Sequence, residues 1–311
     1  MVTFKGVHHV GAGVSDMERS LRFYGDCLGF SERLFDYTGS LPGMERVTGW
    51  PDTIARVVFI ANPNVGPQGL GMIKLVQLLG PEKPGPIPEG TCWGEVGVAE
   101  MTINVHGAEA VMRGLVDEKG CKQIMPLEVG PLLPHGSRAA FGYIAEPDGG
   151  KVEIIEWMEL WPGLHAGPRI EGLNHVAFGV SDLERSLEFY RRLGFDDSVF
   201  VYEGVLEAMN PWFPEPAEQK IELLVNYHGG GIEAVEHPTG IRDCRGTWGH
   251  LGAMEFAIEV ANVDAACAYL EGQGIELLSS PQTVAVDGLE WKYAYFVEPD
   301  NNYVSLVEQR F

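Results

Sequence analysis

The chain has few cysteines, half as many basic as acidic residues and no long apolar run, and each shortage excludes a class of protein. Its five cysteines are odd in number and include no CxxC pair, so we expect neither a disulfide framework nor a zinc knuckle. The 22 Lys and Arg against 44 Asp and Glu give a net charge of -22, which argues against nucleic acid or an anionic membrane as a partner. No transmembrane-length stretch and no basic, apolar leader is present, so we expect a cytoplasmic protein.

The chain is built on a repeated segment. VHHVGAGVSDMERSLRFYGDCLGF at 7–30 returns at 173–195 as LNHVAFGVSDLERSLEFYRRLGF. An alternating stretch leads into a segment with helical spacing, whose apolar stripe in the second copy comprises Leu183, Leu187 and Tyr190. The spacing Ser-x-x-Glu at Ser15 and Ser181 predicts a capping box at each helix start. Each copy therefore predicts a strand, a capped helix and a further strand.

Two further segments also repeat. GTCWGEVGVAEMTINV at 90–105 resembles GTWGHLGAMEFAIEV at 246–260, and AEPDGGKVEIIE at 145–156 resembles VEPDNNYVSLVE at 297–308. With the strands between them, these repeats predict four βαβββ modules, two in each half of the chain. The fold class is therefore α+β, with few helices and many strands.

A Pro- and Gly-rich stretch at 161–168 marks the boundary between the halves. We expect a first domain at 1–160 that holds modules 1 and 2, a linker at 161–169, and a second domain at 170–311 that holds modules 3 and 4.

Strand alternation predicts which polar side chains face away from the helices. In AEMTINV at 99–105 the apolar residues can lie under a helix, which leaves Glu100 on the opposite face, and the matching strand places Glu255 in the same way. His9 and His175 occupy corresponding places in the first strand of each half. Glu153 lies on the last strand of the second module.

These residues carry a resemblance to a known family. The pattern H-x4-V-S-D-x2-R-S-x2-F-Y opens each half, and E-P-D-G-x3-E closes the first. The chain thereby resembles the vicinal oxygen chelate superfamily, which includes glyoxalase I, extradiol ring-cleaving dioxygenases, methylmalonyl-CoA epimerase and the fosfomycin and bleomycin resistance proteins. The resemblance implies that modules pair, that each pair forms a half-open β-barrel cup with helices outside, and that ligands of a divalent metal lie on first and last strands.

The resemblance places candidate metal ligands at His9, Glu100, Glu153, His175, Glu222 and Glu255, with Lys74 and Ser305 at two further ligand positions. If each half closes its own cup, one cup holds His9, Glu100 and Glu153 beside Lys74, and the other holds His175, Glu222 and Glu255 beside Ser305. If modules pair across the halves, one cup gathers His175, Glu222, Glu100 and Glu153, and the other keeps His9 and Glu255. The sequence leaves both pairings open.

A second signature runs from His135 through Tyr143 to Glu153 and resembles that of the extradiol dioxygenases, with departures at Leu133 and Gly142. The resemblance implies that His135 is an acid/base and that Tyr143 donates a hydrogen bond to substrate oxygen, with Glu153 as the third catalytic residue.

The expected function is that of a metal-dependent enzyme of glyoxalase-like, isomerase or lyase character on a small oxygenated organic substrate. Hard oxygen and imidazole ligands suit Mn, Fe, Ni, Co, Zn or Mg, and Glu153 or Glu100 could act both as ligand and as base. Two alternatives stay open, an extradiol-type ring-cleaving dioxygenase and a metal-free small-molecule binding or resistance protein. We expect a small-molecule partner and neither nucleic acid nor membrane, and the sequence leaves open whether two chains form a homodimer.

Overall fold

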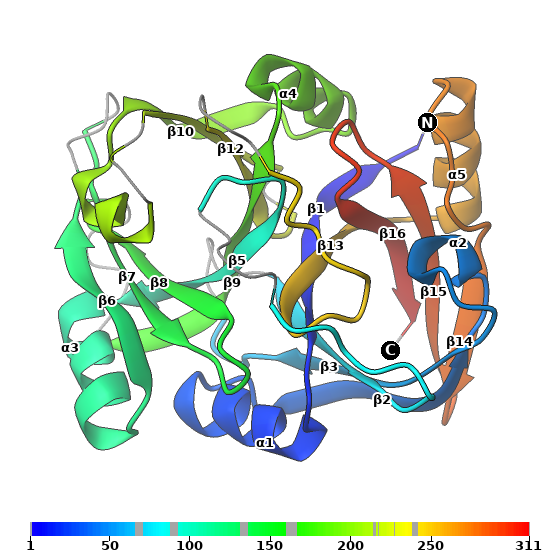
Figure 1. Cartoon of the computed structure of the whole chain (residues 1–311), viewed down its shortest axis with the longest axis horizontal. Helices are drawn as coiled ribbons and strands as arrows, with labels where there is room; N and C mark the ends of the chain where they lie inside the picture. Colours follow the sequence, from blue (N-terminus) through cyan, green and yellow to red (C-terminus); the bar gives the residue numbers. More distant parts are fainter. Residues whose placement is uncertain are drawn as a thin grey trace.

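The protein contains four repeats of one module, in which a first strand and a helix are followed by further strands (Figure 1). The computed structural model describes residues 2–65, 71–87, 93–130, 136–159, 167–213, 216, 218–226, 228–237 and 242–310. The first module comprises β1 (Phe4–Gly13), α1 (Met17–Arg22), its π-helical continuation η1 (Phe23–Cys27), β2 (Glu32–Leu41), α2 (Glu45–Thr48), β3 (Thr53–Ala61) and β4 (Met72–Leu78). The second comprises β5 (Gly97–His106), α3 (Ala108–Arg113), its continuation η2 (Gly114–Glu118), β6 (Lys122–Val129), β7 (Ala139–Ala145) and β8 (Lys151–Trp157).

The second half repeats this order. The third module comprises β9 (Arg169–Val180), α4 (Leu183–Arg192), β10 (Asp197–Gly204), the 3-10 helix η3 (Glu207–Trp212), β11 (Gln219–Val225) and β12 (Gly231–Glu236). The fourth comprises β13 (Gly252–Val260), α5 (Val263–Gly272), β14 (Gln282–Val286), β15 (Leu289–Val297) and β16 (Tyr303–Arg310). The predicted α+β class with four βαβββ modules is confirmed.

The modules pair across the two halves of the chain. One sheet has the strand order β14-β15-β16-β13-β1-β4-β3-β2, which joins module 4 to module 1. The other has the order β10-β11-β12-β9-β5-β8-β7-β6, which joins module 3 to module 2. Each sheet is centred on an antiparallel pair of first strands, β1 with β13 and β5 with β9. Of the two pairings that the sequence leaves open, the structure has the one across halves, while the domain boundaries at 160 and 170 stay a prediction.

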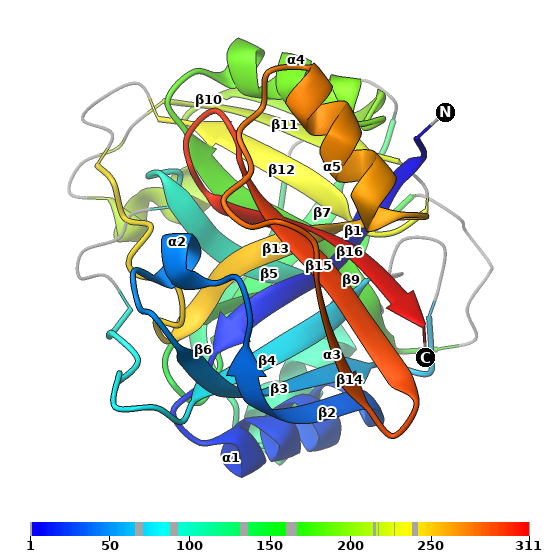
Figure 2. The same ribbon diagram turned by 90° about the vertical axis from the view of Figure 1, so that its right-hand side faces the viewer.

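The two sheets share one core. Its largest hydrophobic cluster draws on all four modules, and Phe178 of β9 stacks on Phe256 of β13 with ring centroids 5.0 Å apart. Backbone hydrogen bonds between Val7 and Gly230 also join the two sheets, with the Val7 amide donating to the Gly230 carbonyl oxygen at 2.7 Å. Helices α1 and α3 lie at one end of the molecule and α4 and α5 at the other (Figures 1 and 2).

The helix stripe in the third module is buried as predicted, with Leu183 7%, Leu187 0% and Tyr190 0% exposed. The predicted capping boxes are wrong, because Asp16 and Asp182 are the N-caps of α1 and α4 and accept from the third amide of each helix. Ser15 instead donates to Asp148 of the segment between β7 and β8, at 2.6 Å from its hydroxyl. That bond ties the first helix to the second module.

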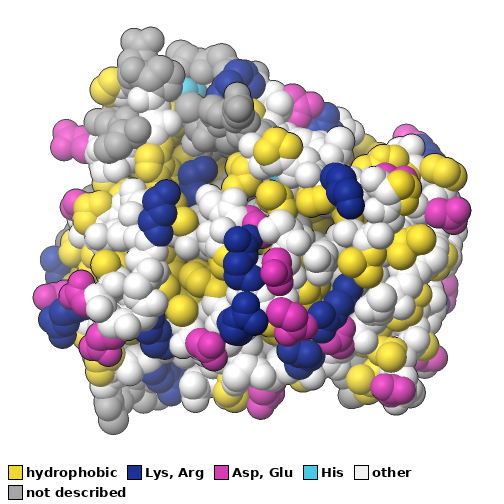
Figure 3. Space-filling view, turned by 60° about the horizontal axis from the view of Figure 1, so that its bottom comes forward, with side chains coloured by type: hydrophobic (Ala, Val, Ile, Leu, Met, Phe, Trp, Pro, Cys, Tyr) yellow, Lys and Arg dark blue, Asp and Glu magenta, His cyan; other side chains and the backbone are white. Residues whose placement is uncertain are grey.

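The described part of the chain has no helix long and apolar enough to cross a membrane. On the face in Figure 3, acidic and basic side chains lie beside one another and form no continuous basic tract. Several charged side chains of the described residues form ion pairs, such as Arg56 with Glu18 at 2.7 Å.

Candidate metal centre

Four ionisable side chains converge on the concave face of the sheet formed by β5–β12. Glu100 and His175 come from the two central strands, and Glu153 and Glu233 from the strands that flank them, β8 and β12. We call this set the acidic cup. All four are buried, with exposures of 0%, 1%, 5% and 8% for Glu100, His175, Glu153 and Glu233.

The imidazole of His175 lies at the centre of the acidic cup. Its Nε2 is 3.6 Å from Glu153 Oε2 and 3.7 Å from Glu233 Oε2. Ligand atoms of Glu100, Glu153 and His175 lie within 4.8 Å of one another. Oxygen and nitrogen ligands lie at about 2.0–2.3 Å from a divalent metal ion such as Zn or Mg. Two ligand atoms on opposite sides of one ion are therefore roughly 4–4.6 Å apart, and the spacing of these three ligand atoms fits one ion.

Neighbouring side chains set the tautomer of His175. Its Nδ1 is 2.7 Å from the Asn174 side-chain oxygen, which can only accept, so Nδ1 carries the proton and the Nε2 lone pair faces the carboxylates. The Thr102 hydroxyl lies 2.8 Å from Glu153 Oε2 and 3.1 Å from His175 Nε2. Because a hydroxyl has one proton, it cannot donate to both, and the Glu100 Oε2 atom has no hydrogen-bond partner among the described residues. The cup thus holds more acceptors than donors.

Burial disfavours the charged forms of the side chains in the acidic cup. It raises the pKa of Glu100 to about 7 and that of Glu233 to about 8, and it raises the pKa of Glu153 well above its ordinary value, with repulsion from the other two carboxylates added. Burial also lowers the pKa of His175 to about 3, so its imidazole is neutral. Three carboxylates that cannot easily ionise together, beside a neutral imidazole, form a donor set that a divalent cation would neutralise.

The residues therefore fit a metal ion. One imidazole and three carboxylates are hard donors, which suit Mn, Fe, Co, Ni, Zn or Mg. They do not form the triad of two histidines and one carboxylate that is typical of non-haem iron oxygenases. Tyr143 donates to Glu100 Oε1 at 3.1 Å, so its hydroxyl already positions a carboxylate of this set.

The sheet formed by β1–β4 and β13–β16 holds the equivalent positions. Lys74 of β4 takes the place of Glu233 of β12. Lys74 pairs with Gly11 of the first strand β1, as Glu233 pairs with Ala177 of the first strand β9. In β16, Ser305 takes the place of Glu153, since it pairs with Tyr295 as Glu153 pairs with Tyr143. His9 and Glu255 complete this second set, which we call the lysine cup, consisting of His9, Lys74, Glu255 and Ser305.

The lysine cup contains its own cation. Lys74 and Glu255 are both 0% exposed and form an ion pair. The Lys74 ammonium lies 4.9 Å from the ring centroid of Trp291. Glu255 also accepts from the Trp248 indole at 2.6 Å and from the Tyr295 hydroxyl. One positive and one negative charge cancel, so this cup has no excess charge for a metal ion to neutralise.

The His9 imidazole differs in its neighbours as well. His9 Nδ1 lies 2.8 Å from His8 Nδ1, and its Nε2 has no hydrogen-bond partner among the described residues. Burial lowers the pKa of His9 well below its ordinary value, with Lys74 adding to the effect. The expectation that His9 and Glu255 bind metal stays a prediction that this arrangement does not favour.

Glu222 is placed elsewhere than expected. Its carboxylate lies 2.7 Å from the guanidinium of Arg191 on helix α4, so it belongs to the helix side of β11. The last strand of the third module is β12, and Glu233 occupies the position that we assigned to Glu222. The match of GMIKLV at 71–76 to GGIEAV at 230–235 could have revealed this, because it aligns Lys74 with Glu233.

The remaining predicted residues divide into two groups. Glu100, Glu153 and His175 are brought together, and their role in binding metal stays a prediction. His135 lies outside the described residues, so its assignment as an acid/base also stays a prediction.

An apolar cavity opens beside the acidic cup. It has a volume of about 50 Å³ and opens to solvent, and Glu153, Glu233 and Tyr143 line it. Its other walls are mainly large apolar side chains, among them Phe141, Ile155, Trp157, Phe200, Met209 and Ile221. Glu100 is not among the lining residues, so Glu153 and Glu233 are, of the described carboxylates, those that border the space a substrate could enter.

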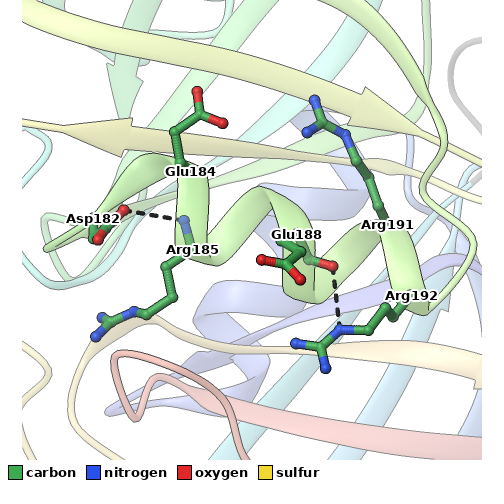
Figure 4. Close-up of a pocket in the computed structure, with 6 residues that line it drawn as sticks. All are labelled: Asp182, Glu184, Arg185, Glu188, Arg191 and Arg192. Atoms are coloured by element: carbon green, nitrogen blue, oxygen red, sulfur yellow. Dashed lines mark hydrogen bonds between the residues drawn. The ribbon is translucent and has the colours of Figure 1, made fainter.

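A second hollow runs along the outside of helix α4 and is lined by Asp182, Glu184, Arg185, Glu188, Arg191 and Arg192 (Figure 4). Its guanidinium groups are engaged by neighbours, as with Arg185 and Asp300 at 3.0 Å. This hollow is a solvated, charged helix face.

Comparisons with known proteins agree with this architecture. The model of the Glyoxalase/Bleomycin resistance protein/Dioxygenase superfamily matches residues 6–154 and 172–306. A probable chloroplastic lactoylglutathione lyase of Arabidopsis thaliana is 28% identical over 227 residues, which cover 70% of this chain and 53% of that protein. A 2-epi-5-epi-valiolone epimerase of Actinomyces sp. is 28% identical over 154 residues, which cover 45% and 80% of the two chains.

The chain thus spans about half the length of the lyase that it matches. Among solved structures, a mutant glyoxalase I from Zea mays superimposes with a TM-score of 0.62, at 19% identity, over 98% of this chain and 94% of that chain. At this identity the likeness shows a shared fold.

Proposed function

Because the chain belongs to the Glyoxalase/Bleomycin resistance protein/Dioxygenase superfamily, we propose that it is a metal-dependent isomerase, epimerase or lyase of glyoxalase-like character. Its substrate is a small organic molecule with oxygens on two adjacent carbons. The observation that carries the proposal is the convergence of three buried carboxylates and one neutral imidazole beside a cavity. The relatives named as a lyase and an epimerase support the reaction class.

The four residues of the acidic cup would hold one divalent cation per chain. When bound there, the cation would stabilise negative charge that develops on the two adjacent substrate oxygens. The lysine cup would hold none, because the Lys74 ammonium already neutralises Glu255. One cup is therefore active, and the other is a structural counterpart.

The protein's carboxylates would move the proton. Glu153 and Glu233 line the cavity from strands that flank the central pair, so they reach a bound molecule from two sides. One of them takes a proton from the carbon next to a carbonyl, and the electron pair of that C–H bond moves to the carbonyl oxygen. Return of a proton to the neighbouring carbon, with transfer of the hydroxyl proton to the former carbonyl oxygen, isomerises an α-hydroxy carbonyl substrate. Return of the proton to the opposite face of the same carbon epimerises it.

Metal content tests the proposal directly. Wild-type protein purified without chelator should carry about one equivalent of divalent metal per chain after dialysis. The variants Glu100→Gln, Glu153→Gln and Glu233→Gln should each lose at least tenfold in metal affinity, because each removes an anionic ligand. Glu222→Gln and Glu255→Gln are the matched controls and should keep the wild-type metal content.

Activity is tested by exchange of hydrogen with solvent. In D₂O, the metal-loaded enzyme should incorporate deuterium next to the carbonyl of α-hydroxyketones such as acetoin, 2-hydroxycyclohexanone or 2-hydroxy-1-phenylethanone, as measured by NMR. Exchange no faster than without enzyme for the whole panel would count against the reaction class. Wild-type protein that takes up no metal on titration would overturn the metal proposal and favour a metal-free binding protein.

A further inference from the structure

The walls of the cavity beside the acidic cup indicate which substrates can enter. The charged side chains among its described lining residues are Glu153 and Glu233, and both are acidic. The other described lining residues are mainly bulky apolar groups, among them Phe141 and Trp157 from module 2 and Phe200 and Ile221 from module 3. A molecule in this space therefore meets two carboxylates and otherwise mainly hydrocarbon.

The described lining residues of this cavity include no Lys or Arg that could pair with an anionic substituent. The parts of the chain outside the described residues contain no Lys or Arg in their sequence. Cations on the flanking strands have partners of their own. Lys220 of β11 pairs with Glu236 at 3.4 Å, and the Lys151 ammonium of β8 lies 5.4 Å from the ring centroid of Trp212.

We infer that the enzyme acts on uncharged, hydrophobic compounds, in which an aryl, alicyclic or branched alkyl group adjoins the two vicinal oxygens. The inference rests on the proposed function and narrows its substrate class. A carboxylate or phosphate on that substituent would be buried among apolar side chains without a Lys or Arg beside it, which is costly. An apolar substituent is favoured by removal of its surface from water. Glutathione conjugates, which carry two carboxylates, are therefore excluded as substrates.

Two catechols with the same pair of oxygens test this inference. 4-tert-Butylcatechol carries an apolar group where 3,4-dihydroxybenzoate carries a carboxylate. Their dissociation constants are measured anaerobically on Co(II)-loaded protein by calorimetry and by the visible cobalt spectrum. We expect tert-butylcatechol to bind at least a hundredfold more tightly than dihydroxybenzoate.

Variants in the cavity wall supply the matched comparison. Leu206→Arg and Phe200→Arg introduce a cation at partly exposed lining positions. Each should raise the affinity for dihydroxybenzoate at least tenfold and lower that for tert-butylcatechol. Val201→Arg is the control, because Val201 is the next residue of β10 and is 56% exposed, and it should leave both affinities unchanged.

The outcomes separate this inference from the proposed function. If cobalt-loaded protein binds dihydroxybenzoate as tightly as tert-butylcatechol, or binds neither, the inference about the substrate class is overturned and the metal centre stands. If the protein takes up no cobalt yet binds tert-butylcatechol preferentially, the apolar selectivity stands and the metal-dependent function is overturned.

Discussion

Replacing Lys74 by methionine would leave the Glu255 carboxylate buried among aromatic rings without the ammonium that it faces. Both side chains are fully buried in the lysine cup. Removing one partner of a buried ion pair typically costs about 3–5 kcal/mol of unfolding free energy. Glu255 would keep two donors, the Trp248 indole at 2.6 Å and the Tyr295 hydroxyl. We therefore expect Lys74→Met to cost about 3 kcal/mol, the low end of this range.

The double variant Lys74→Met with Glu255→Gln separates lost charge pairing from lost packing. It removes both charges and leaves a glutamine oxygen to accept from Trp248, so its unfolding free energy should lie within about 1 kcal/mol of wild type. Urea unfolding of metal-free protein, followed by circular dichroism, gives the three values. Lys220→Met is the control at a solvent-exposed lysine whose ion pair with Glu236 spans 3.4 Å, and it should cost less than about 1 kcal/mol.

The reasoning would be refuted if Lys74→Met cost less than about 1 kcal/mol of unfolding free energy, or if the double variant were less stable than Lys74→Met. The Lys74 ammonium would then not be the internal counter-charge of the lysine cup, and the explanation of why only one cup takes metal would lose its basis.

Three further predictions concern metal stoichiometry, ligand orientation and pH. Lys74→Glu with Ser305→Glu recreates in the lysine cup the charge pattern of the acidic cup, so metal content should rise from about one equivalent toward two. Asn174→Ala should weaken metal affinity about 10–100-fold, since Asn174 orients His175, whereas His8→Ala at the equivalent place should not. Burial raises the pKa of Glu298 from 4.5 to about 7. The folded protein therefore holds the Glu298 proton more tightly than the unfolded chain does, and the free energy of unfolding falls as the pH rises between these two values. Glu298→Gln should remove up to about 3 kcal/mol of this decrease in unfolding free energy, as measured by urea unfolding at pH 5 and pH 8. The same decrease in the variant as in wild type would contradict this prediction.

The sequence alone determined the module and the orientation of its side chains. Alternation within the first strands and helical spacing after them are local patterns, and a strand of period two has one way to turn Glu100 toward the cup while Met101 lies in the core. The repeat placed His9 and His175 alike, and both are buried at matching positions. Local patterns gave the wrong residue where two neighbours could each cap a helix, as with Ser15 and Asp16 at the start of α1.

The tertiary structure alone decided which modules share a cup, and with that which ligands meet. All four modules have similar first strands, so the pairing of β5 with β9 depends on contacts between residues far apart in the chain, which no local pattern encodes. That pairing brings Glu100 and Glu153 to His175 and Glu233, and it leaves Lys74 with Glu255 in the other cup. The same fold therefore produces one cup with excess negative charge and one that is neutral, because the charges add up only after the modules have paired.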